Sequence, residues 1–435
     1  MSPGTQERLT SPVGLALAGG APGGAIYEIG ALRALDEAIL GLDLRDCGCF
    51  VGVSAGAFLG ACLANGLSTA QQVRAIVKHE PGEHPFVPET FFRPAIKELG
   101  LRLLKVPGLL GEAVRDYVTR REGRLLDALT VVGQAIPVGI FDNDPIRDYV
   151  HRIFSIKGRT DEFHQLRRKL TVVTTDLESG ESMRFGHLGW SHVPISVAVQ
   201  ASTALPGLYP PVEINGRQYV DGILLKTMHA SVALEAGAEL VFCINPLVPV
   251  DTRQAVQENR LAAGQVTKRG LPSVMSQTVR TLIHSRMVLG VGAYETKYPD
   301  ADVVLIEPPR DDYQDFFSNI FSFASRRAVV ERAYDATRES LRSRRKELVP
   351  ILERHGLGLD IDFLEDESRD LWVGVGLPEF SPGARSKATP ESESPSAETS
   401  ERLVSEVDET LDQLSGLLDR IERWAEHRSK QREVA

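Results

Sequence analysis

Ser54 stands at the centre of a Gly-x-Ser-x-Gly turn, Gly52-Val53-Ser54-Ala55-Gly56. An apolar run at 47–53 precedes the turn, and an apolar helical pattern begins at 58. Between a strand and a helix, such a turn holds a serine hydroxyl at the mouth of a cleft, while Gly52 and Gly56 let the two elements approach closely. A packing turn rich in small residues is the alternative. The strand-turn-helix context favours a nucleophile that cleaves carboxylic esters.

A loop of small residues, Gly19-Gly20-Ala21-Pro22-Gly23-Gly24, separates an apolar run at 13–18 from a helical pattern at 26–40. Consecutive small residues expose backbone N–H groups that can hold an anion. The loop lacks the spacing of dinucleotide-binding and P-loop motifs, so an oxyanion hole near Ser54 is the better interpretation. The candidate donors are the N–H groups of Gly19, Gly20, Ala21, Gly23, Gly24 and Ala55.

A third element, Asp221-Gly222, follows an apolar pair at 219–220. A carboxylate there could act as the general base for Ser54, provided that burial raises its pKa towards neutrality. An aspartate that merely starts a turn is the common alternative. A Ser-His-Asp triad is the rival catalytic arrangement, with Asp176 or Asp221 as its acid. Its histidine would be one of His229, His284 and His355.

The order and separation of these three motifs resemble those of bacterial patatin-like phospholipases. The block at 199–207 and Pro210-Pro211-Val212 also resemble the segment that precedes the Asp-Gly motif in that family. The resemblance extends from about residue 13 to about residue 306. It implies a three-layer α/β/α sandwich and a Ser54–Asp221 dyad that works without a cofactor. The chain departs from the family pattern in having no arginine in its glycine loop and Ile223 after Gly222.

The composition is that of a globular protein, with 435 residues, 42% hydrophobic and 25% charged, and a net charge of -10. The acidic balance argues against nucleic acid as a partner. Four cysteines lie in apolar stretches and are expected to be buried and reduced, and the scattered histidines lack metal-ligand spacing. We find neither a signal peptide nor an apolar run of the ~20 residues that a spanning helix needs, which predicts a cytoplasmic protein that meets membranes or lipid granules from the surface.

Strand patterns that alternate with helical patterns predict an α/β sheet covered on both faces. Strands are expected at 13–18, 47–53, 170–174, 240–244 and 303–306, and helices at 26–40, 193–201 and 322–352. The expected organisation is a disordered start at 1–10, a hydrolase body at 11–352 with a lid-like helical insert at about 90–134, an extension of the body at 353–379, a disordered linker at 380–400 and an amphipathic heptad helix at 401–432. The heptad spacing predicts self-association through a coiled-coil-like helix.

The favoured hypothesis is a lipid acyl hydrolase that acts on esters at a membrane or lipid-aggregate surface. A second hypothesis keeps the dyad and changes the substrate to an intracellular storage polyester or a neutral glyceride. A third is a catalytically degenerate scaffold that binds acyl lipid and assembles through 401–432.

Overall fold

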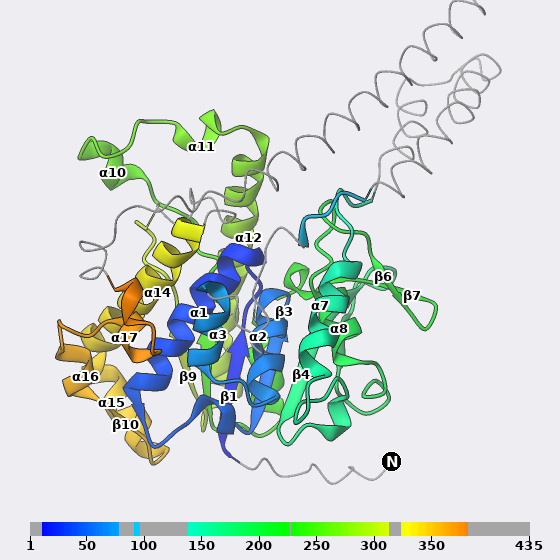
Figure 1. Ribbon diagram of the computed structural model, residues 1–435, viewed down its shortest axis with the longest axis horizontal. Coiled ribbons are helices and arrows are strands. Elements are labelled where there is room, and N and C mark those ends of the chain that lie inside the picture. The colour runs from blue at the N-terminus through cyan, green and yellow to red at the C-terminus, as the bar shows by residue number, and fades with distance from the viewer. Residues whose placement is uncertain (1–10, 78–90, 96–137, 227, 313–322, 382–435) are drawn as a thin grey trace, which may run out of the picture. The chain divides into compact units, whose positions relative to one another are not determined.

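The computed structural model describes residues 11–77, 91–95, 138–226, 228–312 and 323–381 (Figure 1). Five parallel strands form the centre of an eight-stranded sheet in the order β4-β3-β1-β8-β9. Their bounds are Val13–Leu17 (β1), Cys49–Val53 (β3), Lys169–Asp176 (β4), Leu240–Ile244 (β8) and Asp302–Ile306 (β9). Three antiparallel strands extend the sheet beyond β4, namely β5 (Ser182–Phe185), β6 (Val212–Ile214) and β7 (Arg217–Asp221).

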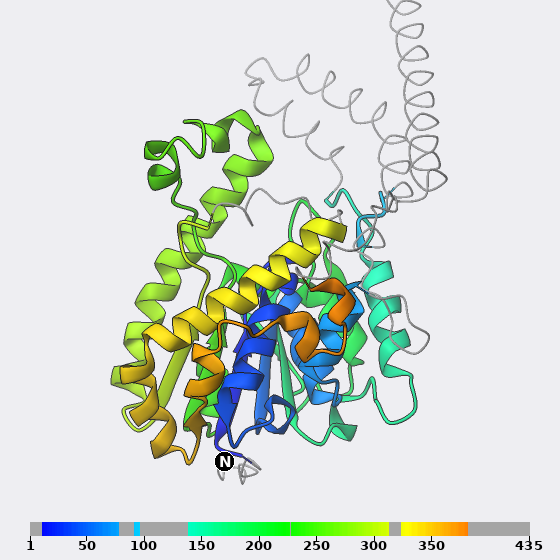
Figure 2. The ribbon, with the colours of Figure 1, turned by 60° about the vertical axis from the view of Figure 1, so that its left-hand side comes forward.

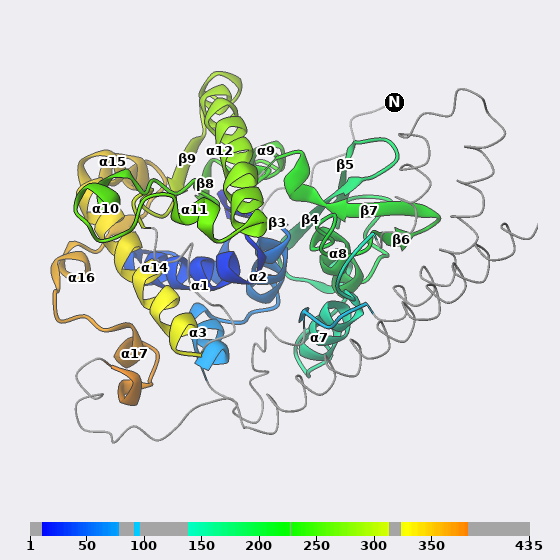
Figure 3. The same cartoon turned by 90° about the horizontal axis from the view of Figure 1, so that it is seen from above.

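Helices cover both faces of this sheet. One face carries α1 (Ala21–Ala38), α2 (Ala55–Ala64) and α8 (Ile195–Ser202), and the other carries α9 (Ala230–Glu235) and α12 (Leu271–Lys297). Figure 3 shows the two helical layers with the strands between them. Because both faces are covered, β1, β3 and β8 are apolar and buried along their whole length. The three-layer α/β/α sandwich that the sequence predicts is therefore confirmed.

Shorter or peripheral elements complete the body. The helices are α3 (Thr69–Val77), α7 (Asp144–Phe154), α10 (Arg253–Gln257), α11 (Gln265–Lys268), α14 (Phe323–Ser343), α15 (Arg345–Arg354), α16 (Ile361–Glu365) and α17 (Leu371–Gly374). Single 3-10 turns are η1 (Leu44–Asp46), η2 (Phe163–Gln165), η3 (Gly222–Leu224) and η4 (Pro378–Phe380), and a small antiparallel pair joins β2 (Ile39–Leu40) to β10 (Gly358–Leu359).

The topology brings the three sequence motifs to one region. The glycine loop follows β1 and Ser54 follows β3, and the carboxyl ends of neighbouring parallel strands lie at the same edge of a sheet. Strand β7 reaches this region from the antiparallel side. In the registers along β4, Val53 pairs with Val173 and Asp221 pairs with Thr174, the next residue.

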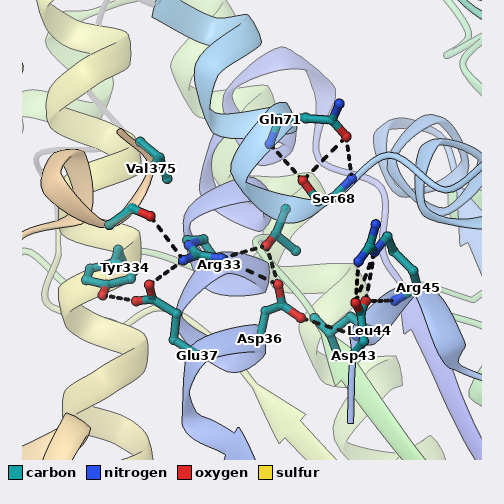
Figure 4. Close-up of polar contacts among 12 residues, drawn as sticks. Arg33, Asp36, Glu37, Asp43, Leu44, Arg45, Ser68, Gln71, Tyr334 and Val375 are labelled. Atoms are coloured by element: carbon teal, nitrogen blue, oxygen red, sulfur yellow. Dashed lines mark hydrogen bonds and ion pairs between the residues drawn. The ribbon is translucent and has the colours of Figure 1, made fainter. Parts of the chain in front are cut away.

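The C-terminal part of the body packs against α1. Figure 2 shows α14 crossing α1, and the absence of a side chain at Gly30 permits this approach, since a Cβ there would lie 2.5 Å from the Val330 carbonyl oxygen. The Glu37 carboxylate accepts hydrogen bonds from Arg33 and Tyr334, as Figure 4 shows, and from Arg369. This network ties α1, α14 and the 353–377 segment together.

Two expectations about helices need correction. The expected single helix at 322–352 is interrupted at Arg344, which separates α14 from α15 and donates a 2.7 Å hydrogen bond to the Leu305 carbonyl at the sheet. Helix α1 begins at Ala21, inside the glycine loop, rather than at residue 26. All four cysteines are free and buried, as predicted.

Several expectations fall outside the described residues: those for 1–10, for most of the insert at 90–134, for the linker beyond 381 and for the heptad helix at 401–432. Within the described part of the chain, every helix is too short or too polar to cross a membrane.

Candidate active site

Ser54 occupies the strained corner between β3 and α2. Its backbone has φ 53° and ψ -121°, a conformation that residues with a side chain rarely adopt. The flanking glycines are required by close packing, because a Cβ at Gly52 would lie 2.4 Å from Ala57 Cα and one at Gly56 would lie 2.5 Å from the Ala18 carbonyl oxygen. The Gly-x-Ser-x-Gly spacing therefore has a steric cause, because only small residues fit on either side of the strained serine.

Ser202 fastens this corner from the neighbouring helix. The Ser54 N–H donates to Ser202 Oγ at 2.8 Å, and the Ser202 hydroxyl donates to the Val173 carbonyl on β4 at 2.7 Å. Ser202 is fully buried at the end of α8. Ser202 lies in the family-like block at 199–207, but its contact with Ser54 spans 148 residues and therefore leaves no local pattern in the sequence.

Asp221 ends β7 with its side chain 2% exposed. Its carboxylate accepts the Ile223 N–H at 3.0 Å, and the Ser54 hydroxyl lies near enough to influence its pKa. Burial raises the pKa of Asp221 to about 7, while the Ile223 N–H and the Ser54 hydroxyl oppose the rise. The Asp221 N–H donates to the Ala204 carbonyl at 3.0 Å, and the Thr175 hydroxyl donates to the Asp221 carbonyl at 3.1 Å. The aspartate is thus a rigidly held carboxylate that exchanges its proton near neutral pH.

Gly19 is the point where the three motifs meet. A Cβ on Gly19 would lie 3.0 Å from Ser54 Cβ and 2.9 Å from Ile223 Cδ1. The residue after Asp221 is equally constrained, because a Cβ on Gly222 would lie 2.5 Å from the Val173 carbonyl oxygen. The glycine loop, the serine turn and the Asp-Gly turn therefore form one site.

The candidate oxyanion donors are fewer in the structure than in the sequence. The Gly24 N–H already donates to the Gly20 carbonyl at 2.8 Å, and Pro22 has no N–H. Ser54 donates its N–H to Ser202, and Gly56 donates its N–H to the carbonyl that follows β1, at 3.0 Å. The N–H groups that remain as candidates belong to Gly19, Gly20, Ala21, Gly23 and Ala55.

His229, which precedes α9, lies next to the Asp-Gly turn. Its Nε2 is 3.4 Å from the Gly222 carbonyl oxygen, and burial lowers its pKa to about 4. The ring is therefore neutral at physiological pH, and Nε2 would act as a donor to that carbonyl. This geometry suits a group that supports the turn after Asp221, rather than a base for Ser54.

The other groups considered for a triad lie beside residues that do not belong to the dyad. His284 Nδ1 lies 3.8 Å from Glu307 Oε1, and His355 Nε2 lies 2.8 Å from Asp302 Oδ2. Asp176 accepts backbone N–H groups of its own turn at 3.0 Å and 3.2 Å. Within the described residues, no three His, Cys, Asp or Glu side chains gather closely enough to hold a metal ion.

A family model for patatin-like phospholipases matches residues 15–234, about half of the chain, and includes all three motifs. The chain belongs to the patatin-like phospholipase family. The resemblance inferred from the motifs is thereby confirmed.

Relatives within reach of sequence comparison are distant. Uncharacterized NTE family proteins from Mycobacterium bovis and Mycobacterium tuberculosis are each 29% identical over 102 residues. The match covers 23% of this chain, and the chain spans about a quarter of the length of these curated relatives (25%). Among solved structures, VipD from Legionella pneumophila aligns with a TM-score of 0.34 and 17% identity, covering 76% of this chain and 66% of VipD.

Proposed function

We propose that this patatin-like protein is a serine lipid acyl hydrolase that cleaves carboxylic esters through a Ser54–Asp221 dyad. One observation carries the proposal: the hydroxyl of a serine on a strained turn lies beside a buried carboxylate with a pKa of about 7. Membership of the patatin-like phospholipase family supports lipid esters as the substrate class.

In the first half-reaction, Ser54 Oγ attacks the ester carbonyl carbon while Asp221 takes the hydroxyl proton. The negative charge that develops on the carbonyl oxygen is stabilised by backbone N–H groups of the glycine loop and by that of Ala55, at the start of α2. Collapse of the tetrahedral intermediate breaks the ester bond. Asp221 returns its proton to the departing alcohol, and an acyl-serine remains.

In the second half-reaction, Asp221 takes a proton from water, and the resulting hydroxide attacks the acyl carbon. The same N–H groups stabilise the second oxyanion, and collapse releases the carboxylic acid and restores the Ser54 hydroxyl. The Ser202 hydrogen bond would hold the serine backbone in position through both steps.

The test uses the purified full chain, a water-soluble ester and a fluorophosphonate probe that labels activated serines. Ser54→Ala is expected to abolish labelling and hydrolysis, and Asp221→Asn to lower the hydrolytic rate by at least ~100-fold, in the range of general-base catalysis. Asp148→Asn, which removes an exposed carboxylate on α7, serves as the matched control and should leave the rate unchanged. Full hydrolysis by both site variants would refute the dyad.

A substrate panel then separates the substrate classes. Phospholipid vesicles, a triglyceride emulsion and polyester granules are offered to the wild-type chain, with Ser54→Ala as the blank. Preferential release of fatty acid from phospholipid supports a phospholipase, whereas preference for either of the other two reassigns the substrate. A wild-type chain that the probe fails to label would instead support a degenerate lipid-binding scaffold.

A further inference from the structure

Helix α12 carries an apolar stripe on its outer side. Its inner residues, which include Ile283 and Met287, pack into the core beside α9. The opposite side exposes large apolar residues at spacings of three, four and seven, which places them on one face of the helix. These residues, which we call the α12 stripe, are Leu271, Met275, Val279, Leu282 and Leu289. Leu271 and Leu289 are 72% and 75% exposed, so the stripe is open from one end to the other.

The stripe runs past the candidate active site. Arg286, which lies on the same helix face, donates a 2.9 Å hydrogen bond to the Leu224 carbonyl at the end of η3. Leu224 follows Asp221 by three residues, and its own side chain is 42% exposed. The C-terminal part of the stripe is therefore joined to the turn that follows the proposed general base, and Leu224 extends the apolar surface to that turn.

The charge around the stripe is opposite to that of the whole chain. Residues 251–297, which end with α12, contain seven Lys or Arg residues and three acidic residues, in a protein with a net charge of -10. Lys268 and Arg269 precede the stripe, and Arg286 lies within it, all three on the exposed surface. Basic residues beside exposed leucines suit an anionic lipid surface, where the leucines enter the acyl region and the cations meet the head groups.

A second copy of the chain is a poorer match for this face. A two-fold dimer would bring identical patches together, so the basic residues of one stripe would oppose those of the other. The site also needs access to an ester that is presented by an aggregate, and a dimer through this face would cover the surface next to Leu224.

We propose that the α12 stripe, together with Leu224, is the surface by which the protein docks on anionic lipid. The choice of lipid as the partner rests on the proposed lipid hydrolase function. Docking on this face places the turn at Asp221 next to the lipid surface, where an ester can enter the site from the aggregate.

The experiment measures docking separately from hydrolysis. All proteins carry Ser54→Ala and are sedimented with vesicles of phosphatidylcholine alone or mixed equally with phosphatidylglycerol. The stripe variant is Leu282→Gln with Leu289→Gln. The matched control is Leu177→Gln with Leu188→Gln, two leucines outside α12 that are 50% and 101% exposed, against 62% and 75% for Leu282 and Leu289. Circular dichroism and thermal unfolding check that each variant is folded.

The parent protein is expected to bind the anionic vesicles more tightly than the neutral ones and to bind less as salt is raised. The stripe variant should bind at least about tenfold more weakly, because two leucine side chains are no longer transferred from water into the lipid. The control should bind as tightly as the parent. Equal binding by the stripe variant would overturn the proposal. A parent protein that binds neither kind of vesicle would also overturn the proposal. One such outcome is a parent protein that does not bind vesicles but forms a dimer, with the stripe variant as a monomer. Because the vesicle-binding assay involves no turnover, failure of the docking proposal can be distinguished from failure of the hydrolase proposal.

Discussion

The Asp221→Asn variant tests two effects of this buried carboxylate separately: its effect on the free energy of unfolding and its proposed role in hydrolysis. The asparagine keeps the shape of the side chain and the oxygen that accepts the Ile223 N–H. The Ser54 hydroxyl can rotate to accept a hydrogen bond from the new amide. The substitution therefore removes an ionisable group with little change in packing.

The expected effect on stability follows from the pKa of Asp221, which burial raises from 3.8 to about 7. In the unfolded chain this carboxyl loses its proton near pH 4, whereas in the folded chain it keeps the proton until about pH 7. The wild-type protein should therefore lose stability as the pH rises from 4 to 7. With one pKa unit equal to about 1.4 kcal/mol, the cost of ionising Asp221 in the folded chain approaches about 4 kcal/mol above pH 7.

Asp221→Asn lacks this cost. It should exceed the wild type in free energy of unfolding by about 4 kcal/mol at pH 8, about 2 kcal/mol at pH 5 and about 0.6 kcal/mol at pH 4. Hydrolysis by the wild type should rise with pH through about 7 as Asp221 ionises, whereas the variant should be nearly inactive throughout.

Urea unfolding at the three pH values, followed by tryptophan fluorescence, measures the stability difference, and initial rates on a soluble ester measure the activity. A variant that is less stable than the wild type at pH 8 would refute the reasoning. An excess of stability that is equal at pH 4 and pH 8 would also refute it, because the effect would then not come from ionisation.

Two further predictions concern Ser202, which contacts the Ser54 backbone, and Glu37, which links helices of the body. Ser202→Ala should lower kcat by about 10–100-fold with little change in KM, because it removes the acceptor for the Ser54 N–H. Ser196→Ala, which removes another buried hydroxyl from α8, should leave kcat unchanged, and equal losses of kcat in the two variants would exclude positioning by Ser202. Glu37→Ala should lower the free energy of unfolding by about 3 kcal/mol, because two arginines and a tyrosine lose their shared carboxylate. Asp148→Asn is the exposed control for urea unfolding, and a Glu37→Ala change as small as that of the control would show that the network adds little stability.

The chemical part of the site could be predicted from the sequence because it depends on local backbone sterics. Only small residues fit at Gly52 and Gly56, so the serine turn leaves a recognisable spacing. Buried strands such as β8, Leu240–Ile244, have the bounds that the apolar runs predict. The Asp-Gly turn by itself is weak evidence for a general base, and it became informative only because it follows the other two motifs in the chain.

The helices were harder to predict. Helix α12 escaped the sequence interpretation because it has apolar residues on both its inner and its outer side, so its pattern lacks the single apolar face that marks an amphipathic helix. The break between α14 and α15 was also missed. It coincides with a contact between Arg344 and β9, which lies 39 residues earlier in the chain.

The sequence by itself determined the serine turn, the glycine loop and the candidate base, since residue size and order encode them. Only the tertiary structure decided how they work together. Folding buries Asp221, which moves its pKa to about 7, and brings Ser202 to the Ser54 N–H. It also reduces the set of N–H groups open to an oxyanion, because Gly24 already donates to Gly20. Each of these depends on groups distant in sequence or on backbone geometry, and neither burial nor a hydrogen-bond partner can be read from residue types alone.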